Sequence, residues 1–207
     1  MTQYWPAYLA GLLVSLAAQA APAQTTVVRI EEDRQLHITQ PDVPLDAPQI
    51  TTTMIPFAWQ PELLLQVDLN HGTHPSFTNG GLQVRASIDD ECAAHTRSLA
   101  DVRLHHESET VDWAQVVALT NSRFSFGIIN GSSESWGTFG GSSTELDIAA
   151  SMVGGNLSLD GYSTQQSLSN SGVTYASNRV GHLRPKKIRV HLSNGYVSEF
   201  TLNHDVL

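Results

Sequence analysis

Two histidines stand three residues apart in the stretch VDLNHGTHPSFTNGGLQV, which covers residues 67–84. His71 and His74 follow closely after Asp68, and imidazole and carboxylate groups are the ligands that zinc binds in proteins. A loop containing Gly72 can aim both rings at one ion, although a zinc site needs three or four protein ligands. The stretch therefore has two interpretations, a polar hairpin loop, which we favour, and a metal site.

The remaining ligands of such a site would have to come from distant parts of the chain. His95, His105 and His106 are candidates because the chain holds nine histidines, but no spacing selects among them. The zincin motif H-E-x-x-H is absent, since Thr110 stands where the second histidine would follow His106. The sequence therefore assigns no metal ligand and no cofactor.

Catalytic motifs are missing as well. The chain contains no G-x-S-x-G nucleophile elbow, no P-loop and no G-x-G-x-x-G phosphate-binding turn. Glu145 and Asp147 would share one face of a strand. Such a pair could serve as the two carboxylates that a glycoside hydrolase needs. A solvated strand edge explains the same spacing, and we prefer that explanation. The sequence thus yields no catalytic residue and leans towards a protein that is not an enzyme.

The strongest binding feature is a pair of aromatic residues in a loop rich in glycine and serine. Trp136 and Phe139 lie in ESWGTFGG, where every other residue is small or polar. An exposed ring there could stack on a sugar or fill a pocket of a partner protein. The favoured alternative is that Trp136 folds back and plugs the end of the domain. We therefore name Trp136 and Phe139 as candidate ligand contacts, with the exposure of the Trp136 ring as the deciding observation.

The N-terminus predicts export. Residues 7–21 form an uncharged apolar run that ends at Ala21-Pro22-Ala23, which fits signal peptide cleavage before Gln24. An earlier site at Ala18–Ala20 is the alternative, and the first five residues carry no Lys or Arg. A membrane anchor would need a longer apolar run. We expect a signal peptide over residues 1–23 and a protein that is secreted or periplasmic, in the cell envelope.

Composition limits the class of protein and its partners. The mature chain of about 184 residues is the size of one domain and holds a single cysteine, Cys92, so packing rather than disulfides must stabilise it. The net charge of −9 makes nucleic acid an unfavourable partner. The mature chain contains no second long apolar run, so no membrane span is expected after cleavage.

Alternating apolar residues predict several half-buried strands. The expected strands cover residues 62–70, 82–88, 123–129, 144–150 and 156–162. Residues 108–121 fit a short helix capped by Ser108, with a strand as the alternative because of the β-branched content. Residues 163–172 are polar and fit a helical turn.

The segment before these strands has a different character. Residues 25–39 contain two short β-prone runs around the acidic residues 31–33, which we interpret as a turn. Residues 40–61 hold five prolines, so they predict an irregular arm that Phe57 and Trp59 attach to the core. Residues 24–61 thus form an N-terminal β segment and arm packed on a β-rich region over residues 62–207.

The C-terminus predicts a β-hairpin over residues 186–202. A three-residue loop over residues 193–195 places apolar partners on one face and leaves Gly195 in the left-handed conformation. The expected pairs are Leu192 with Tyr196, Val190 with Ser198 and Ile188 with Phe200. Together these patterns predict an all-β chain folded as a single β-sandwich or jelly roll with at most one or two short helices.

The leading functional hypothesis is an exported, acidic, non-catalytic protein that acts by binding or assembly, with an extracellular glycan or protein as its partner. The alternative is a secreted hydrolase of an extracellular polymer that uses a metal ion or carboxylates. A structural module that associates with itself is a third interpretation and needs the same fold.

Overall fold

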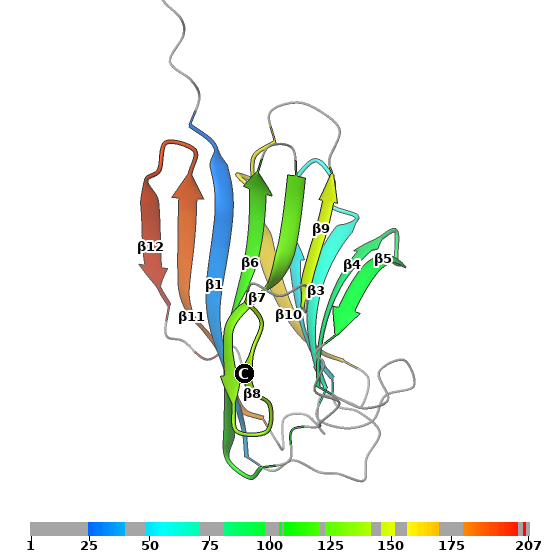
Figure 1. Ribbon diagram of the computed structural model, residues 1–207, viewed down its shortest axis with the longest axis vertical. Helices are drawn as coiled ribbons and strands as arrows, with labels where there is room; N and C mark the ends of the chain where they lie inside the picture. Colours follow the sequence, from blue (N-terminus) through cyan, green and yellow to red (C-terminus); the bar gives the residue numbers. More distant parts are fainter. Residues whose placement is uncertain are drawn as a thin grey trace, which may run out of the picture.

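The computed structural model describes residues 25–39, 49–70, 81–97, 104, 106–120, 123–141, 146–151, 157–169, 180–202 and 205. These residues form two packed antiparallel sheets and contain no helix, which confirms the predicted β-sandwich (Figure 1). The strands are β1 (Val27–Ile38), β2 (Gln49–Ile55), β3 (Leu63–Asn70), β4 (Gly81–Ile88), β5 (Glu91–Arg97), β6 (Glu109–Thr120), β7 (Arg123–Ser133), β8 (Gly137–Phe139), β9 (Asp147–Ser151), β10 (Ser163–Ser169), β11 (Val180–Leu192) and β12 (Val197–Thr201).

The two sheets differ in width. The first has seven strands in the order β12-β11-β1-β6-β7-β8, with β9 also paired to β7. The second has five strands in the order β10-β2-β3-β4-β5. The core lies between them, and it includes the alternating inward residues of β3 and β4 that the sequence predicts: Leu65, Val67, Leu69, Leu82 and Val84.

The predicted helix over residues 108–121 is wrong, because β6 occupies Glu109–Thr120. This strand lies inside the first sheet, between β1 and β7, and most of its residues are buried on both faces. Its inward residues Val111, Trp113 and Val117 belong to the core. A strand buried on both faces loses the alternation that identifies strands from sequence, and its apolar residues then mimic a helical stripe.

The predicted acidic turn within residues 25–39 is also wrong, since β1 runs without interruption from Val27 to Ile38. Its even-numbered residues from Ile30 onward are buried and its odd-numbered residues are half-buried. Glu31 and Asp33 therefore face outward, while Glu32 faces the core. The acidic residues occur within a strand because each carboxylate has a basic partner, as described below.

The predicted proline-rich arm contains a strand that lies inside the second sheet. β2 pairs with β10 on one side and with β3 on the other. Pro56 follows this strand, so it removes no hydrogen bond from its ladder. Phe57 is fully buried as expected, whereas Trp59 stacks on it from outside with 62% of its surface exposed.

The predictions of a strand at residues 156–162 and of a helical turn at residues 163–172 are both wrong. Residues 157–162 form a turn rather than a strand, and residues 163–169 form β10 rather than a helical turn. β10 is the edge strand of the second sheet and pairs with β2 over its whole length. Its residues are almost all polar, so the sequence shows no apolar alternation that would identify a strand.

The C-terminal hairpin is confirmed in both register and loop. Ile188 pairs with Phe200 and Val190 with Ser198. The amide of Leu192 donates to the carbonyl of Tyr196 at 2.9 Å, and Gly195 adopts a φ of 87°. The basic residues 184–189 lie in β11.

A buried ion pair connects the two sheets. Glu32 and Arg34 are both at most 1% exposed, and the Nε of Arg34 donates to Glu32 at 3.0 Å. Gln115 of β6 and Tyr162, next to β10, also donate to the Glu32 carboxylate. Arg34 in turn donates to Thr164 of β10 at 2.9 Å.

These contacts hold the edge of the second sheet over β1. The main chain adds two further contacts, because the amide of Leu159 donates to the carbonyl of Val27 and the amide of Val27 donates to Ser158. Burial and the neighbouring Glu32 charge raise the pKa of Tyr162 well above its ordinary value. Tyr162 therefore remains a protonated donor at neutral pH. We call the set Glu32, Arg34, Gln115, Tyr162 and Thr164 the polar clamp.

Replacement of Glu32 should destabilise the fold strongly. Glu32→Gln removes the carboxylate charge and leaves the Arg34 guanidinium buried without its counter-ion, which typically costs about 3–5 kcal/mol. Urea unfolding of this variant should show that loss, whereas the matched change at exposed Glu91 should alter the free energy of unfolding by less than about 0.5 kcal/mol. A loss at Glu32 no larger than that at Glu91 would contradict the role of the clamp.

Candidate functional site

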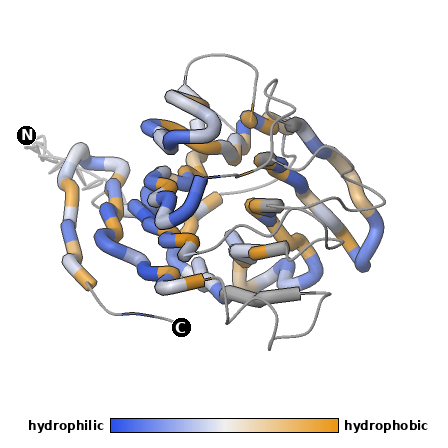
Figure 2. The backbone as a smooth tube through the Cα atoms, turned by 90° about the horizontal axis from the view of Figure 1, so that it is seen from below, coloured by the Kyte–Doolittle hydropathy of each residue, from blue (hydrophilic) through white to orange (hydrophobic). Residues whose placement is uncertain are grey.

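The first sheet extends beyond the second. The polar clamp places β10, the edge of the second sheet, over β1, while β11 and β12 continue the first sheet beyond β1. Figure 1 shows strands of the second sheet behind β6, β7 and β9 but none behind β12. The view from below in Figure 2 shows the strands near the C-terminus as a single layer beside the double layer. We call β11, β12 and the loop between them the overhang.

Four of the six exposed large apolar side chains in the described parts of the chain lie on the overhang or directly after it. Tyr196 is 62% exposed and Phe200 is 54% exposed, and both project from the face that would be the interior if the second sheet reached this far. Val197 and Leu202 are also exposed. Apolar side chains gathered on one sheet face and its edge are typical of a contact surface rather than of scattered surface residues.

The main chain of β12 also has hydrogen-bonding groups that no other described strand pairs with. β12 is the end strand of its sheet within the described topology. The β11–β12 ladder bonds through its even-numbered residues, as the contacts at Tyr196 and Leu202 show. The amides and carbonyls of Val197, Glu199 and Thr201 therefore point away from β11, towards the open edge.

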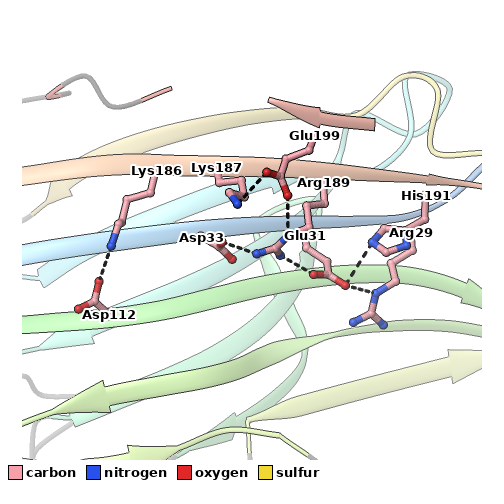
Figure 3. A network of polar contacts seen from close by, with 9 residues as sticks. All are labelled: Arg29, Glu31, Asp33, Asp112, Lys186, Lys187, Arg189, His191 and Glu199. Atoms are coloured by element: carbon pink, nitrogen blue, oxygen red, sulfur yellow. Dashed lines mark hydrogen bonds and ion pairs between the residues drawn. The ribbon is translucent and has the colours of Figure 1, made fainter. Parts of the chain in front are cut away.

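The opposite face of the overhang is polar and internally paired. Arg189 of β11 contacts Glu31 at 2.7 Å and also contacts Asp33, both from β1 (Figure 3). Lys187 contacts Glu199 of β12 at 2.8 Å. Each of these charges thus has an opposite charge on the neighbouring strand.

The pairing shifts the pKa values in the directions that keep these groups charged. Burial alone would raise the pKa of Glu31, but hydrogen bonds and charges from Arg29 and Arg189 lower it below its ordinary value. Burial alone would lower the pKa of Arg189, and Asp33 and Glu31 instead raise it. A hydrogen bond from Lys187 lowers the pKa of Glu199. These groups suit a structural network better than proton transfer, which needs a pKa near the working pH.

A shallow cavity of about 270 Å³ lies on the first sheet next to this network. Asp33, Asp112, Asn130, Lys186 and Arg189 contribute to its lining. Lys186 contacts Asp112 at 3.4 Å, and Arg189 contacts Asp33. Asp33, Asp112, Lys186 and Arg189 are therefore paired with one another across the cavity.

Trp136 and Phe139 are buried in the structure. They are 8% and 7% exposed, and their rings meet edge to face with centroids 5.7 Å apart. The Phe139 ring covers Gly131, where an added Cβ would lie only 2.1 Å from the ring. Neither ring presents a free face in this arrangement, so the packing agrees with the plug interpretation. Ligand contact by Trp136 or Phe139 stays a prediction.

His71 and His74 lie outside the described residues, as do His105 and Glu145, so the metal site and the carboxylate pair stay predictions. Among the residues that are described, no three His, Cys, Asp or Glu side chains come together to hold a metal ion. Asp68 is buried and accepts hydrogen bonds from Thr51 and Arg85 at 2.7 Å.

The remaining candidates do not gather at one place in the part of the chain that the structure describes. His95 lies 3.9 Å from the exposed thiol of Cys92, and His106 contacts Glu134. Burial raises the pKa of Asp147, and the Arg123 charge partly offsets that effect.

The structure identifies functional candidates that sequence reasoning missed. The sequence predicts that Tyr196 and Phe200 lie on the apolar face of the hairpin, but it does not reveal that this face lies beyond the second sheet. The number of strands in each sheet decides that exposure, and β2, β5 and β10 were not expected.

No helix among the described residues is long and apolar enough to cross a membrane. No protein-family model matches the chain, and no curated protein is significantly similar to it.

Truncation of the buried Trp136 should cost much more stability than truncation of the exposed Trp59. Trp136→Ala removes a buried ring that packs on Phe139 and should lower the free energy of unfolding by about 3 kcal/mol or more. Trp59→Ala removes a ring that is 62% exposed and should cost less than about 1 kcal/mol. Urea unfolding of both variants compares the two sites, and an equal loss would contradict the plug interpretation.

Proposed function

We propose that this chain is an exported, non-catalytic β-sandwich protein that acts by binding or assembly, and that the overhang is its contact surface. The observation that carries the proposal is the coincidence of exposed apolar side chains with an open strand edge on β12. Catalysis needs converging reactive groups, whereas a contact surface needs accessible apolar area and directional hydrogen bonds.

The rigidity of the overhang supports this role. Ion pairs from β11 to both β1 and β12 hold it on its polar face. The hydrogen bond from Leu202 to the Lys186 carbonyl fixes its far end. A surface that is already ordered loses little conformational entropy when a partner binds, so its exposed aromatic residues can contribute most of their apolar area to affinity.

Strand edges of this kind recognise partners by β-augmentation, in which an extended segment adds one strand to the sheet. Main-chain hydrogen bonds then supply affinity, and side chains on alternate positions supply specificity. The edge amides of β12 and the apolar face beside them are arranged for that mode. The export of the chain stays part of the proposal, on the signal-like sequence over residues 1–23.

Site-specific photo-crosslinking in cells tests this function. A photoreactive phenylalanine analogue at position 196 should form covalent adducts in the exported fraction, because Tyr196 projects from the overhang. The same analogue at position 59 is the matched control, since Trp59 is equally exposed but lies outside the overhang.

Adducts from position 196 alone, on a mature chain that begins at Gln24, are the expected result. Equal labelling from both positions would show random collision and contradict the proposed surface. The absence of adducts from either position would contradict a binding or assembly role for the overhang.

A further inference from the structure

The open edge of β12 has a hydrogen-bonding pattern that can match itself. In an antiparallel pair of identical strands, each strand offers the same groups to the other about a two-fold axis. The outward groups of β12 belong to Val197, Glu199 and Thr201, so only registers that pair odd-numbered residues with one another form a ladder. Three such registers overlap well, centred on Ser198, Glu199 or Phe200.

Charge and apolar contact separate these three registers. The register centred on Glu199 sets two carboxylates directly opposite each other, which is unfavourable. The register centred on Phe200 pairs that ring with its copy but extends from Ser198 to Leu202, so it leaves Tyr196 and Val197 without partners from β12.

The register centred on Ser198 satisfies both requirements. Tyr196 then lies opposite the partner's Phe200, and the same pair occurs twice because of the two-fold axis. These are non-hydrogen-bonded positions, at which facing side chains come closest, and aromatic pairs there stabilise a sheet. Glu199 lies opposite the partner's Val197, so no like charges meet.

The rows beyond these pairs also match. On the apolar face, the paired Ile188 and Phe200 of one copy lie in line with the paired Tyr196 and Leu192 of the partner. The four side chains form an uninterrupted apolar row across four strands. On the polar face, Glu199 keeps its contacts with Lys187 at 2.8 Å and Arg189 at 3.5 Å of its own chain. Joining the edges therefore leaves no new charge without a partner.

β12 is short and carries Glu199, but among the described residues it lacks the other features that keep strand edges apart. Protected edges carry a proline, an inward-facing charge, a bulge or a covering segment. Val197–Thr201 contains no proline and no lysine, and its ladder with β11 shows no irregularity. Its inward positions hold Ser198 and Phe200 rather than charged residues.

We propose that two copies of this chain associate through β12, antiparallel about a two-fold axis at Ser198, so that the seven-stranded sheets form one continuous sheet. The proposal rests on the proposed function and names a second copy as the partner. The contact involves about five residues of each chain and is smaller than a standard interface, so a weak and transient association is expected.

Disulfide trapping tests the register. In a Cys92→Ser background the introduced cysteine is the chain's only thiol. The Cα atoms of a non-hydrogen-bonded antiparallel pair are about 4.5 Å apart, which suits a disulfide. Ser198→Cys should therefore form a covalent dimer in a glutathione buffer at least tenfold more readily than Glu199→Cys or Phe200→Cys. Preferential trapping through either of the other two positions, or equal trapping by all three, would overturn the proposal.

Sedimentation equilibrium tests the association without a cysteine. The average mass of the wild-type chain should rise towards that of two chains as its concentration approaches 1 mM. Val197→Pro removes an outward amide but no β11–β12 hydrogen bond, so this variant should stay at the mass of one chain with unchanged circular dichroism. A wild-type chain that remains single throughout, or a Val197→Pro variant that associates equally, would overturn the proposal.

The two proposals fail in different ways. A wild-type chain that stays single but forms adducts with another protein from position 196 would overturn the second-copy proposal and leave the binding function intact. A single chain without adducts would overturn both.

Discussion

The buried carboxylate of Glu32 is the contact on which the arrangement of the two sheets depends. It accepts hydrogen bonds from β1, β6 and the segment that leads into β10, and Arg34 extends the same network to Thr164. A charge in the interior is costly unless it is paired and hydrogen-bonded, so an alignment of the sheets that removed Tyr162 and Thr164 would leave this buried ion pair with fewer hydrogen bonds. The polar clamp therefore selects one alignment of the sheets rather than simply adding stability.

That alignment explains the overhang. The second sheet ends at β10 over β1, and the first sheet continues for two more strands. Val180 and Leu183 of β11 still belong to the core, so with strands about 4.8 Å apart the uncovered apolar face is about 5–10 Å wide. Tyr196 and Phe200 are exposed for this reason, and not because the hairpin is irregular. The same hairpin, in a sandwich with a sixth strand in its second sheet, would contribute them to the core.

The sequence predicts the parts of this fold in which one strand face is apolar and the other polar. The alternation of apolar and polar residues predicts β3, β4, the start of β7 and the C-terminal hairpin. The pairing of apolar residues across that hairpin predicts its Ser193–Gly195 loop. The sequence pattern gives the wrong structure where both faces of a strand are buried, as in β6. It also does so at residues 31–33, where basic side chains pair with the acidic residues of a strand. Glu32 and Arg34 were missed because their partners, Tyr162 and Thr164, lie about 130 residues away. The overhang could not be predicted, since it depends on the relative widths of two sheets.

Amide hydrogen exchange by NMR, measured at two protein concentrations, tests the use of the open edge most directly. The amides of Val197 and Glu199 point away from β11, while those of Ser198 and Phe200 point into the ladder with it. If β12 pairs with a second copy, exchange at Val197 and Glu199 slows severalfold as the concentration rises, and Ser198 and Phe200 are protected at both concentrations. Exchange at Val197 and Glu199 that is fast and independent of concentration would contradict the account.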